Sequence, residues 1–243
     1  MRSAISKWIR SKWRGQDDRP NQLREEVQFW RSWFETRGLE WPEDYVKRLN
    51  PKEPIQDHVA RYIDRLEGDC IHILDVGAGP LTKLGKVHAS KQIVITATDL
   101  LAHEYDRLLD ECKIKPLVRT VFADTEKLVD QFGENAFDIV HGQNCVDHTA
   151  NPLRAIEQML KVTRLKGFVV LFHVENEGKK ESYGQLHKWD FTCENGDFMV
   201  RGPHESGINV SKMLAPVGDF ECILAKGNIL TAIRKKRPVE ISD

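Results

Sequence analysis

The sequence predicts an α/β fold, with a doubly wound, mostly parallel, seven-stranded sheet whose last strand is antiparallel and a helical N-terminal extension. Three observations predict it. From residue 71 onward, apolar β-branched runs alternate with helical patterns. The runs are continuous, which is typical of strands buried on both faces of a parallel sheet. Two final strand patterns flank Lys226-Gly227, a hairpin signal that predicts an antiparallel end to the sheet.

Each element follows in order along the chain. The strand patterns before the hairpin cover 71–76, 92–99, 117–124, 137–144 and 167–175. The helical patterns between them cover 81–89, 101–112, 125–132 and 152–163. Because right-handed crossovers join parallel strands, we expect these helices to cover both faces of the sheet.

Two segments lie outside this alternation, so we divide the chain into an extension at 1–69 and a core at 70–237. The extension is helical, broken by prolines and rich in aromatic residues, and we expect it either to cap the active site or to pack on the core. The core contains an insertion at 176–219 with an Asn195-Gly196 hairpin signal. Long insertions are usually lids or binding loops.

The composition excludes several classes of protein. The 243 residues carry a formal net charge of −1, which argues against a nucleic-acid-binding protein. Five scattered cysteines predict reduced thiols in a cytoplasmic protein. The basic segment 1–15 either makes weak contact with an anionic membrane surface or docks on its own domain or on the second subunit of a homodimer.

The stretch "ILDVGAGP" (73–80) predicts a ligand site. No Lys-Ser/Thr pair follows the last glycine, which excludes a Walker loop. The dinucleotide fingerprint fails at its third glycine, and Asp75 would repel a bound pyrophosphate. S-adenosylmethionine has no phosphate and carries a sulfonium cation, which a carboxylate attracts. Gly77 and Gly79 would let the backbone approach it closely.

These residues resemble motif I of the class I S-adenosylmethionine-dependent methyltransferases, and the type 11-like pattern continues in register over about 70–175. The resemblance implies the following cofactor contacts: Asp75, Gly77, Ala78 and Gly79 around the methionine part, Asp99 and Leu100 at the ribose, Asp124 at the adenine amino group, and Asn144 near the methionine end. Asp99 and Asp124 could equally cap the helices that follow them.

The acceptor would bind beyond the carboxyl ends of the strands. His148 is our candidate general base, and the alternative is a structural loop histidine. We expect substrate contacts from His173, Tyr183, His187 and Trp189, although Tyr183 and Trp189 could instead pack the insertion on the core. His187 and Asp190 could form an acid–base pair or half a metal site, but we expect no metal because no clear ligand cluster appears.

We therefore expect a methyltransferase that uses S-adenosyl-L-methionine and acts on a small-molecule or saccharide acceptor, most simply at oxygen. Two alternatives remain within this family: an N-methyltransferase of small molecules, and a non-catalytic cofactor-binding subunit of a larger assembly. A nicotinamide-dependent oxidoreductase is the alternative outside it.

Overall fold

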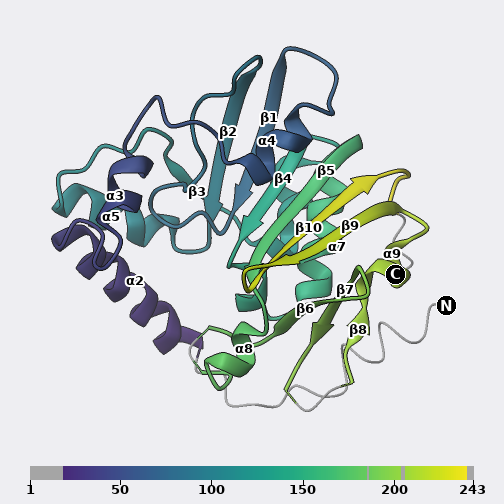
Figure 1. Ribbon diagram of the computed structural model, residues 1–243. Coiled ribbons are helices and arrows are strands. Elements are labelled where there is room, and N and C mark those ends of the chain that lie inside the picture. Colours follow the sequence, from purple (N-terminus) through teal and green to yellow (C-terminus); the bar gives the residue numbers. More distant parts are fainter. Residues whose placement is uncertain (1–18, 185, 204–205, 240–243) are drawn as a thin grey trace.

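A seven-stranded sheet forms the centre of the computed structural model, which describes residues 19–184, 186–203 and 206–239 (Figure 1). Across the sheet lie β3 (Thr120–Phe122), β2 (Gln92–Asp99), β1 (Cys70–Val76), β4 (Phe137–Gln143), β5 (Thr163–Val174), β10 (Asn228–Lys235) and β9 (Gly218–Ala225), in that order. The first five strands pair in parallel, and β10 runs antiparallel to both of its neighbours. The predicted sheet is confirmed.

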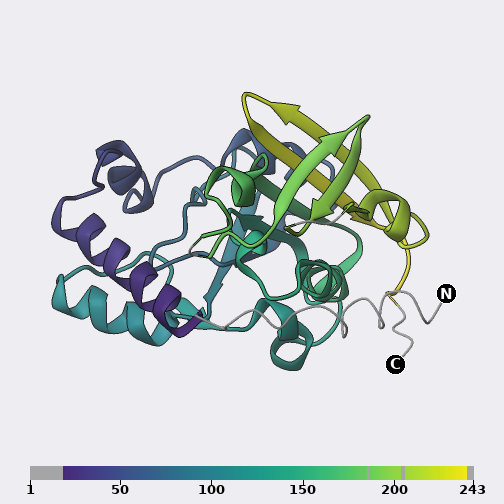
Figure 2. The ribbon, with the colours of Figure 1, turned by 90° about the horizontal axis from the view of Figure 1, so that it is seen from below.

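The register brings the carboxyl ends of the central strands to one edge of the sheet. Asp75 near the end of β1 pairs with Ala97 in β2 and with His141 in β4. Figure 2 shows the molecule from this end. Side chains from strands that are far apart in the sequence therefore meet where open α/β sheets bind their ligands.

Alternate side chains of the central strands enter two different apolar layers. Ile71 and Ile73 of β1 pack under α4 (Asp57–Ile63), whereas Leu74 and Val76 point to the opposite face. That second face is covered by α6 (Leu128–Phe132) and α7 (Pro152–Val162). Burial on both faces explains why the strands read as continuous apolar runs in the sequence.

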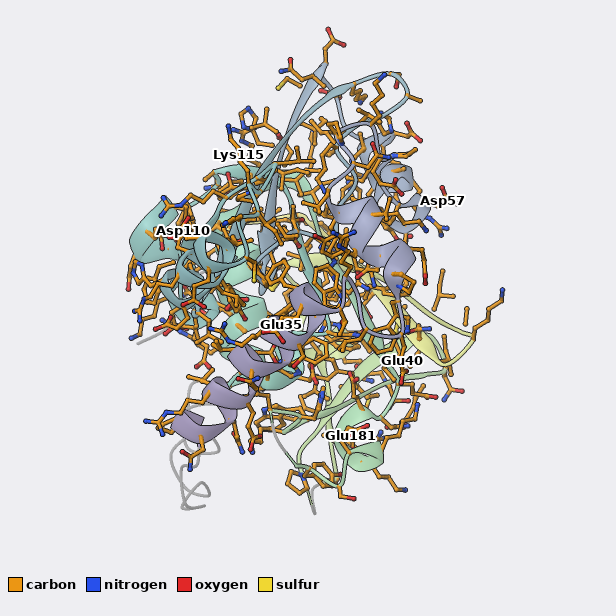
Figure 3. The ribbon with its side chains drawn as sticks, turned by 90° about the vertical axis from the view of Figure 1, so that its left-hand side faces the viewer. Glu35, Glu40, Asp57, Asp110, Lys115 and Glu181 are labelled. Carbon is orange, nitrogen blue, oxygen red and sulfur yellow. The ribbon has the colours of Figure 1, made fainter. Side chains whose placement is uncertain are left out.

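The N-terminal helices pack through aromatic side chains. They are α2 (Arg19–Glu35) and α3 (Pro42–Arg48), and α2 lies against α5 (Ala102–Glu111). Trp30, Trp33 and Tyr105 form edge-to-face pairs in a cluster that also holds Leu81. Figure 3 views this side of the molecule, with Glu35 of α2 and Asp110 of α5 labelled. The segment 1–15, expected to contact a membrane or a second subunit, lies outside the described residues.

The predicted helix at 81–89 is wrong. This segment is an irregular loop that crosses the chain after α3, where Ile55 N donates to Val87 O at 2.8 Å. A Cβ on Gly85 would lie only 2.0 Å from Pro54 O, so the two backbones are in close contact. The Thr82 hydroxyl accepts a hydrogen bond from Leu84 N, which offers the backbone a turn in place of a helix.

The insertion forms a small second sheet beside the carboxyl edge. It comprises α8 (Glu177–Lys180), β6 (Asp190–Glu194), β7 (Asp197–Arg201), β8 (Ile208–Asn209) and α9 (Val210–Leu214). The predicted hairpin is confirmed, because β6 and β7 pair antiparallel across Asn195 and Gly196, both of which have positive φ. Among the described helices, none has the length and apolarity that a membrane span requires.

Candidate functional site

A cleft of about 900 Å³ lies at the carboxyl edge of the sheet. It is lined by nine of the residues predicted from the sequence: Asp75, Gly77, Ala78, Gly79, Asp99, Leu100, Asn144, His148 and His187. Four others do not line it, namely Asp124, His173, Tyr183 and Trp189. The N-terminal helices contribute Glu26, Trp30 and Trp33 to the same wall.

The glycine loop has a backbone that other residues adopt only at a cost. Gly77 and Gly79 have φ values of +61° and +66°. A Cβ on Gly77 would lie 2.4 Å from Cys145 Cβ, and one on Gly79 would lie 2.7 Å from Trp30 Cζ2. The loop is therefore held between Cys145 on one side and α2 on the other. Burial raises the pKa of the Cys145 thiol well above its usual value, as expected for a packing residue.

Asp75 lies beneath this loop and is almost fully buried. One carboxylate oxygen is 2.7 Å from His141 Nδ1, and the other accepts from the Thr82 hydroxyl at 2.6 Å. Both oxygens thus have protein partners. Asp75 shapes the loop from below and also lines the cleft.

Asp99, at the end of β2, lines the cleft and joins two loops. Its Oδ2 accepts from Gly79 N at 3.1 Å, and its Oδ1 accepts from Leu101 N at 2.9 Å. Burial raises the pKa of this carboxyl to about 6, although the two backbone hydrogen bonds act in the opposite direction. Since each carboxylate oxygen can accept more than one hydrogen bond, both retain capacity for ligand hydroxyls.

Asp124 is the N-cap of the short 3-10 helix η1 (Thr125–Lys127). Its Oδ1 accepts from Glu126 N at 2.9 Å. The neighbouring Thr125 lines the cleft in its place. The capping role is therefore the one observed, and the contact with adenine stays a prediction.

Asn144 begins the turn that follows β4, and His173 near the end of β5 contacts that turn. Asn144 lines the cleft with φ +46°, and its Oδ1 accepts from Val174 N at 3.2 Å. His173 Nε2 accepts from Cys145 N at 3.4 Å and from Val146 N at 3.3 Å. Burial lowers the pKa of His173 to about 4, so this imidazole is neutral at pH 7. It supports the turn and does not line the cleft.

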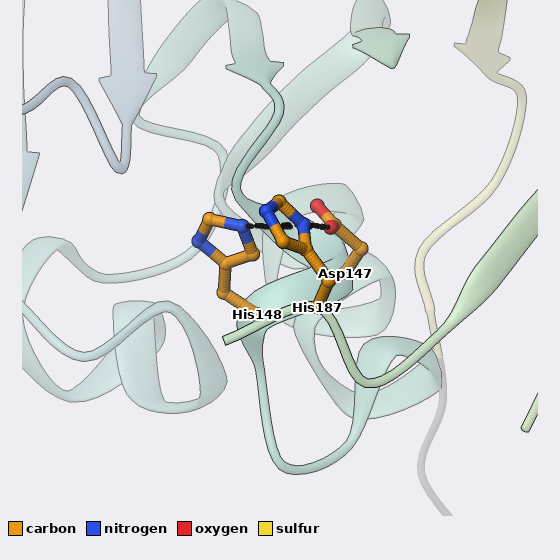
Figure 4. A group of neighbouring side chains, drawn as sticks. All are labelled: Asp147, His148 and His187. Atoms are coloured by element: carbon orange, nitrogen blue, oxygen red, sulfur yellow. Dashed lines mark hydrogen bonds and ion pairs between the residues drawn. The ribbon is translucent and has the colours of Figure 1, made fainter. Parts of the chain in front are cut away.

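His148 ends the 3-10 helix η2 (Val146–His148) and is part of a polar group, shown in Figure 4. His148 Nε2 lies 3.1 Å from His187 Nδ1, which in turn lies 2.8 Å from Asp147 Oδ2. Burial lowers the pKa of His148. Burial also acts to lower the pKa of His187, but the hydrogen bond and charge of Asp147 outweigh it and the net pKa is raised.

Asp147 is the centre of this group and is buried. Burial acts to raise its pKa, but the neighbouring His148, His187 and His173 outweigh it and the net pKa is lowered. Glu177 of α8 lies nearby, with Oε2 3.9 Å from His187 Nδ1. Burial, aided by the charge of Asp147, raises the pKa of Glu177 to about 7.

The insertion is fixed to η2 by two hydrogen bonds that place His187 against His148. Lys188 N donates to Asp147 O at 3.1 Å, and Trp189 Nε1 donates to Thr149 O at 3.0 Å. The pairing of His187 with Asp190, which the sequence left open, is not the one observed. Asp190 instead accepts from the Tyr183 hydroxyl at 2.6 Å and from Lys179 N at 2.7 Å. Tyr183 and Trp189 thus hold the insertion together and on the core.

The sequence assigns no role to His141 or Glu177, places Asp147 only at the acceptor edge, and places Trp30 only in the aromatic extension that caps the site or packs on the core. His141 lies in β4 directly beside Asp75 of β1. Because both strands were predicted, this neighbour of Asp75 could have been found from the sequence. Asp147 precedes the predicted base in the sequence, but its partner His187 comes from the insertion. Nothing in the local pattern indicates that Glu177 faces the cleft, whereas Trp30 lines it as the cap alternative expects.

Comparison with known families supports the interpretation of the fold. Residues 74–171 match the model of a methyltransferase domain. The comparison with curated proteins gave no match.

Solved structures share the fold at low sequence identity. The carbon methyltransferase of CurJ aligns at 12% identity and a TM-score of 0.52, over 74% of this chain and 52% of that one. The CMeT domain of the citrinin polyketide synthase aligns at 18% identity and a TM-score of 0.51, over 72% and 50%. This chain thus spans about half the length of those two. An S-adenosyl-L-methionine-dependent methyltransferase structure from Methanococcus maripaludis aligns at 12% identity and a TM-score of 0.50, over 95% and 99%.

The site fits the cofactor of such a domain. The glycine loop leaves space that a Cβ would fill, and the carboxylate of Asp99 has unused acceptor capacity toward a pair of hydroxyls. S-adenosylmethionine is that cofactor. Residues 74–171 match a methyltransferase domain, and this match together with the shared fold supports a class I S-adenosylmethionine-dependent methyltransferase.

Proposed function

We propose that this methyltransferase acts on a hydroxyl group of a small polar acceptor, such as a sugar or a glycoconjugate. One observation carries the proposal: Asp99, which would hold the cofactor, and the group of His148 and His187 line the same cleft. Methyl transfer to a hydroxyl requires that the acceptor lose a proton, and imidazole is the side chain best suited to take it near neutral pH.

The cofactor, when bound, supplies a methyl group on a cationic sulfur that is already a good leaving group. The chain has to bind and align the two substrates. In our proposal the backbone of Gly77, Ala78 and Gly79 contacts the methionine part, Asp99 accepts from the ribose hydroxyls, and Leu100 lies beside the ribose. Asn144 lies at the methionine end, nearest to η2.

His148 takes the proton of the acceptor in this scheme. Its lowered pKa keeps the imidazole neutral at pH 7, the form that can accept a proton. Its Nε2 contacts His187, and Figure 4 shows the second ring nitrogen on the side away from that contact. Asp147 and His187 orient the ring and would stabilise the charge that it gains.

We also propose that two segments enclose the acceptor and exclude water. The helices within 19–63 supply Trp30 and Trp33 to the cleft, and the insertion supplies Glu177, Leu186 and His187. A cleft lined by aromatic and polar side chains suits a sugar, which presents apolar faces and hydroxyl edges.

The variant His148→Ala tests the proposed base. We expect turnover to fall by about 10²–10⁴-fold, while the affinity for S-adenosylhomocysteine changes less than about twofold. Turnover is measured against a panel of sugars, amines and carbon acids with radiolabelled methyl donor. Full turnover in the variant would exclude His148 as the base. Methylation of only amines or carbon acids by the wild type would exclude the hydroxyl acceptor.

A further inference from the structure

We propose that Asp147, His148 and His187 bind a divalent transition-metal ion at the acceptor end of the cleft, an inference that rests on the proposed methyltransferase function. Their ligand atoms lie within 4.8 Å of one another. The contacts measure 2.8 Å from His187 Nδ1 to Asp147 Oδ2, 3.1 Å from His187 Nδ1 to His148 Nε2, and 3.5 Å from His148 Nε2 to Asp147 Oδ2. Figure 4 shows the three side chains converging.

Hydrogen bonding alone does not satisfy this arrangement. His187 Nδ1 carries at most one proton, yet it faces both a carboxylate oxygen and a second imidazole nitrogen. If the nitrogen donates to Asp147, it has no lone pair for His148. If instead the nitrogen is unprotonated and accepts from His148, it has no proton to donate to Asp147, and its lone pair lies next to the carboxylate. A cation between the three atoms uses all three lone pairs at once.

The spacing matches a single ion. Zn–N and Zn–O bonds are about 2.0–2.2 Å long. The circle through the three atoms has a radius of about 1.8 Å from their separations, so one ion can lie about 2.1 Å from each of them. The ion would then sit about 1 Å out of the plane of the three atoms, which leaves further coordination positions open.

Two carboxylate oxygens beside the group give independent support. Asp147 is only 2% exposed, and within the described part of the chain its Oδ1 has no hydrogen-bond partner. The same holds for Glu177 Oε2, a buried atom 3.9 Å from His187 Nδ1. A buried oxygen without a donor is costly, and a cation would remove that cost. Glu177 is therefore positioned as a fourth ligand.

The donor set indicates which class of ion would bind. Two imidazoles with one carboxylate suit Zn²⁺, Fe²⁺ or Mn²⁺, whereas Mg²⁺ prefers oxygen ligands. Because His148, His187 and Glu177 line the cleft, the open positions would face the acceptor. A cation there would bind an acceptor hydroxyl and lower its pKa. With the ion bound, His148 would serve as a ligand through Nε2 in place of taking the proton itself, and the hydroxyl, its pKa lowered by the ion, would lose its proton to solvent water.

The sequence did not indicate this site because the ligands are far apart along the chain. His187 lies 40 residues after Asp147 and comes from the insertion. The sequence itself predicts no metal, because no clear ligand cluster appears in it.

The test is calorimetric titration of chelator-treated, full-length protein with ZnCl₂, followed by metal analysis of the dialysed complex. We expect one Zn²⁺ per chain with micromolar or tighter affinity, and affinity at least about tenfold weaker in His187→Ala. The matched control is His103→Ala, because His103 is exposed, stacks on Phe122 and lies outside the cleft. We expect the control to bind as the wild type does. The thermal midpoint of each variant shows whether it has folded.

Binding of S-adenosylhomocysteine to the same samples separates the two proposals. If the cofactor product binds but Zn²⁺ does not, the metal site is wrong and the methyltransferase assignment stands. If His187→Ala binds Zn²⁺ as tightly as the wild type, the ion occupies some other site and the proposal is also overturned. If Zn²⁺ binds but the cofactor product does not, the metal site survives and the proposed function fails.

Discussion

In the proposed site, Asp99 is the residue on which cofactor binding would depend most directly. Its two oxygens bridge Gly79 and Leu101, so it both fixes the glycine loop and faces the cleft. Burial keeps its pKa raised to about 6, so ionising it at neutral pH costs the folded protein free energy. A ligand that donates hydroxyl hydrogen bonds would stabilise the ionised form and offset that cost.

The affinity for S-adenosylhomocysteine should therefore depend on pH. Above pH about 6 the carboxylate of Asp99 is ionised and would accept from the ribose; below it the carboxyl takes up a proton and loses acceptor capacity. We expect affinity to be constant from pH about 7 to about 8 and to fall as pH drops through about 6. The control is the same calorimetric series on Asp99→Asn, because the amide of this variant does not titrate. A wild-type profile as flat as that of the variant would contradict the assignment.

Gly77 is the second residue whose importance both the sequence and the structure indicate. Its positive φ and its contact with Cys145 explain why the motif needs glycine there. Gly133 is a matched control, because it also has a positive φ of +72° but has nothing within 4 Å of the position of a Cβ.

We expect Gly133→Ala to lower the free energy of unfolding by about 1 kcal/mol, the cost of the left-handed backbone alone. Gly77→Ala adds a clash with Cys145, so we expect a loss of about 2–4 kcal/mol together with loss of S-adenosylhomocysteine binding. Urea denaturation measures both. Equal destabilisation by the two substitutions would show that the contact with Cys145 is easily relieved.

At the scale of elements, the strands were predictable from the sequence. A strand that is buried on both faces of the sheet consists of a continuous run of apolar residues, and such a run is visible in the sequence. The prediction failed at 81–89, where the contact with Pro54 and the hydroxyl of Thr82 replace a helix. Helical periodicity is a local signal, and a distant segment that bonds to the same backbone overrides it.

The end of β10 is a second place where local reasoning fails. The run 234–237 reads as a solvated basic end, yet Lys235 is buried in the structure. Its ammonium donates to Asn135 Oδ1 at 2.9 Å, Lys161 O at 3.1 Å and Thr163 O at 2.7 Å, which joins β10 to the end of α7.

Replacing Lys235 should therefore destabilise the fold. Lys235→Met keeps much of the side-chain volume but removes the buried ammonium that donates to Lys161 O and Thr163 O, and we expect a loss of about 2 kcal/mol. The exposed Lys236 is the control, and Lys236→Met should change stability by less than about 0.5 kcal/mol. The two variants are compared by thermal and urea unfolding, and similar losses in both would rule out the buried role of Lys235.

At the scale of the whole molecule, the order of strands and crossovers follows from general rules, and these made the class of fold predictable. The approach of the N-terminal helices and the insertion to the cleft was not predictable in the same way. Trp30 meets Gly79, and His187 meets His148, across long separations in the chain. The residues that we propose to hold the cofactor lie at the ends of strands that follow one another in the chain, and they could be identified from the sequence. The acceptor half depends on packing between segments.

The measurement that tests the account most directly is calorimetric titration of the full-length protein with S-adenosylhomocysteine, with NADH as the comparison ligand. We predict one site of micromolar or tighter affinity for S-adenosylhomocysteine, greatly weakened in Asp99→Ala, and no binding of NADH. Binding of NADH at Asp99, with no response to S-adenosylhomocysteine at millimolar concentration, would contradict the account.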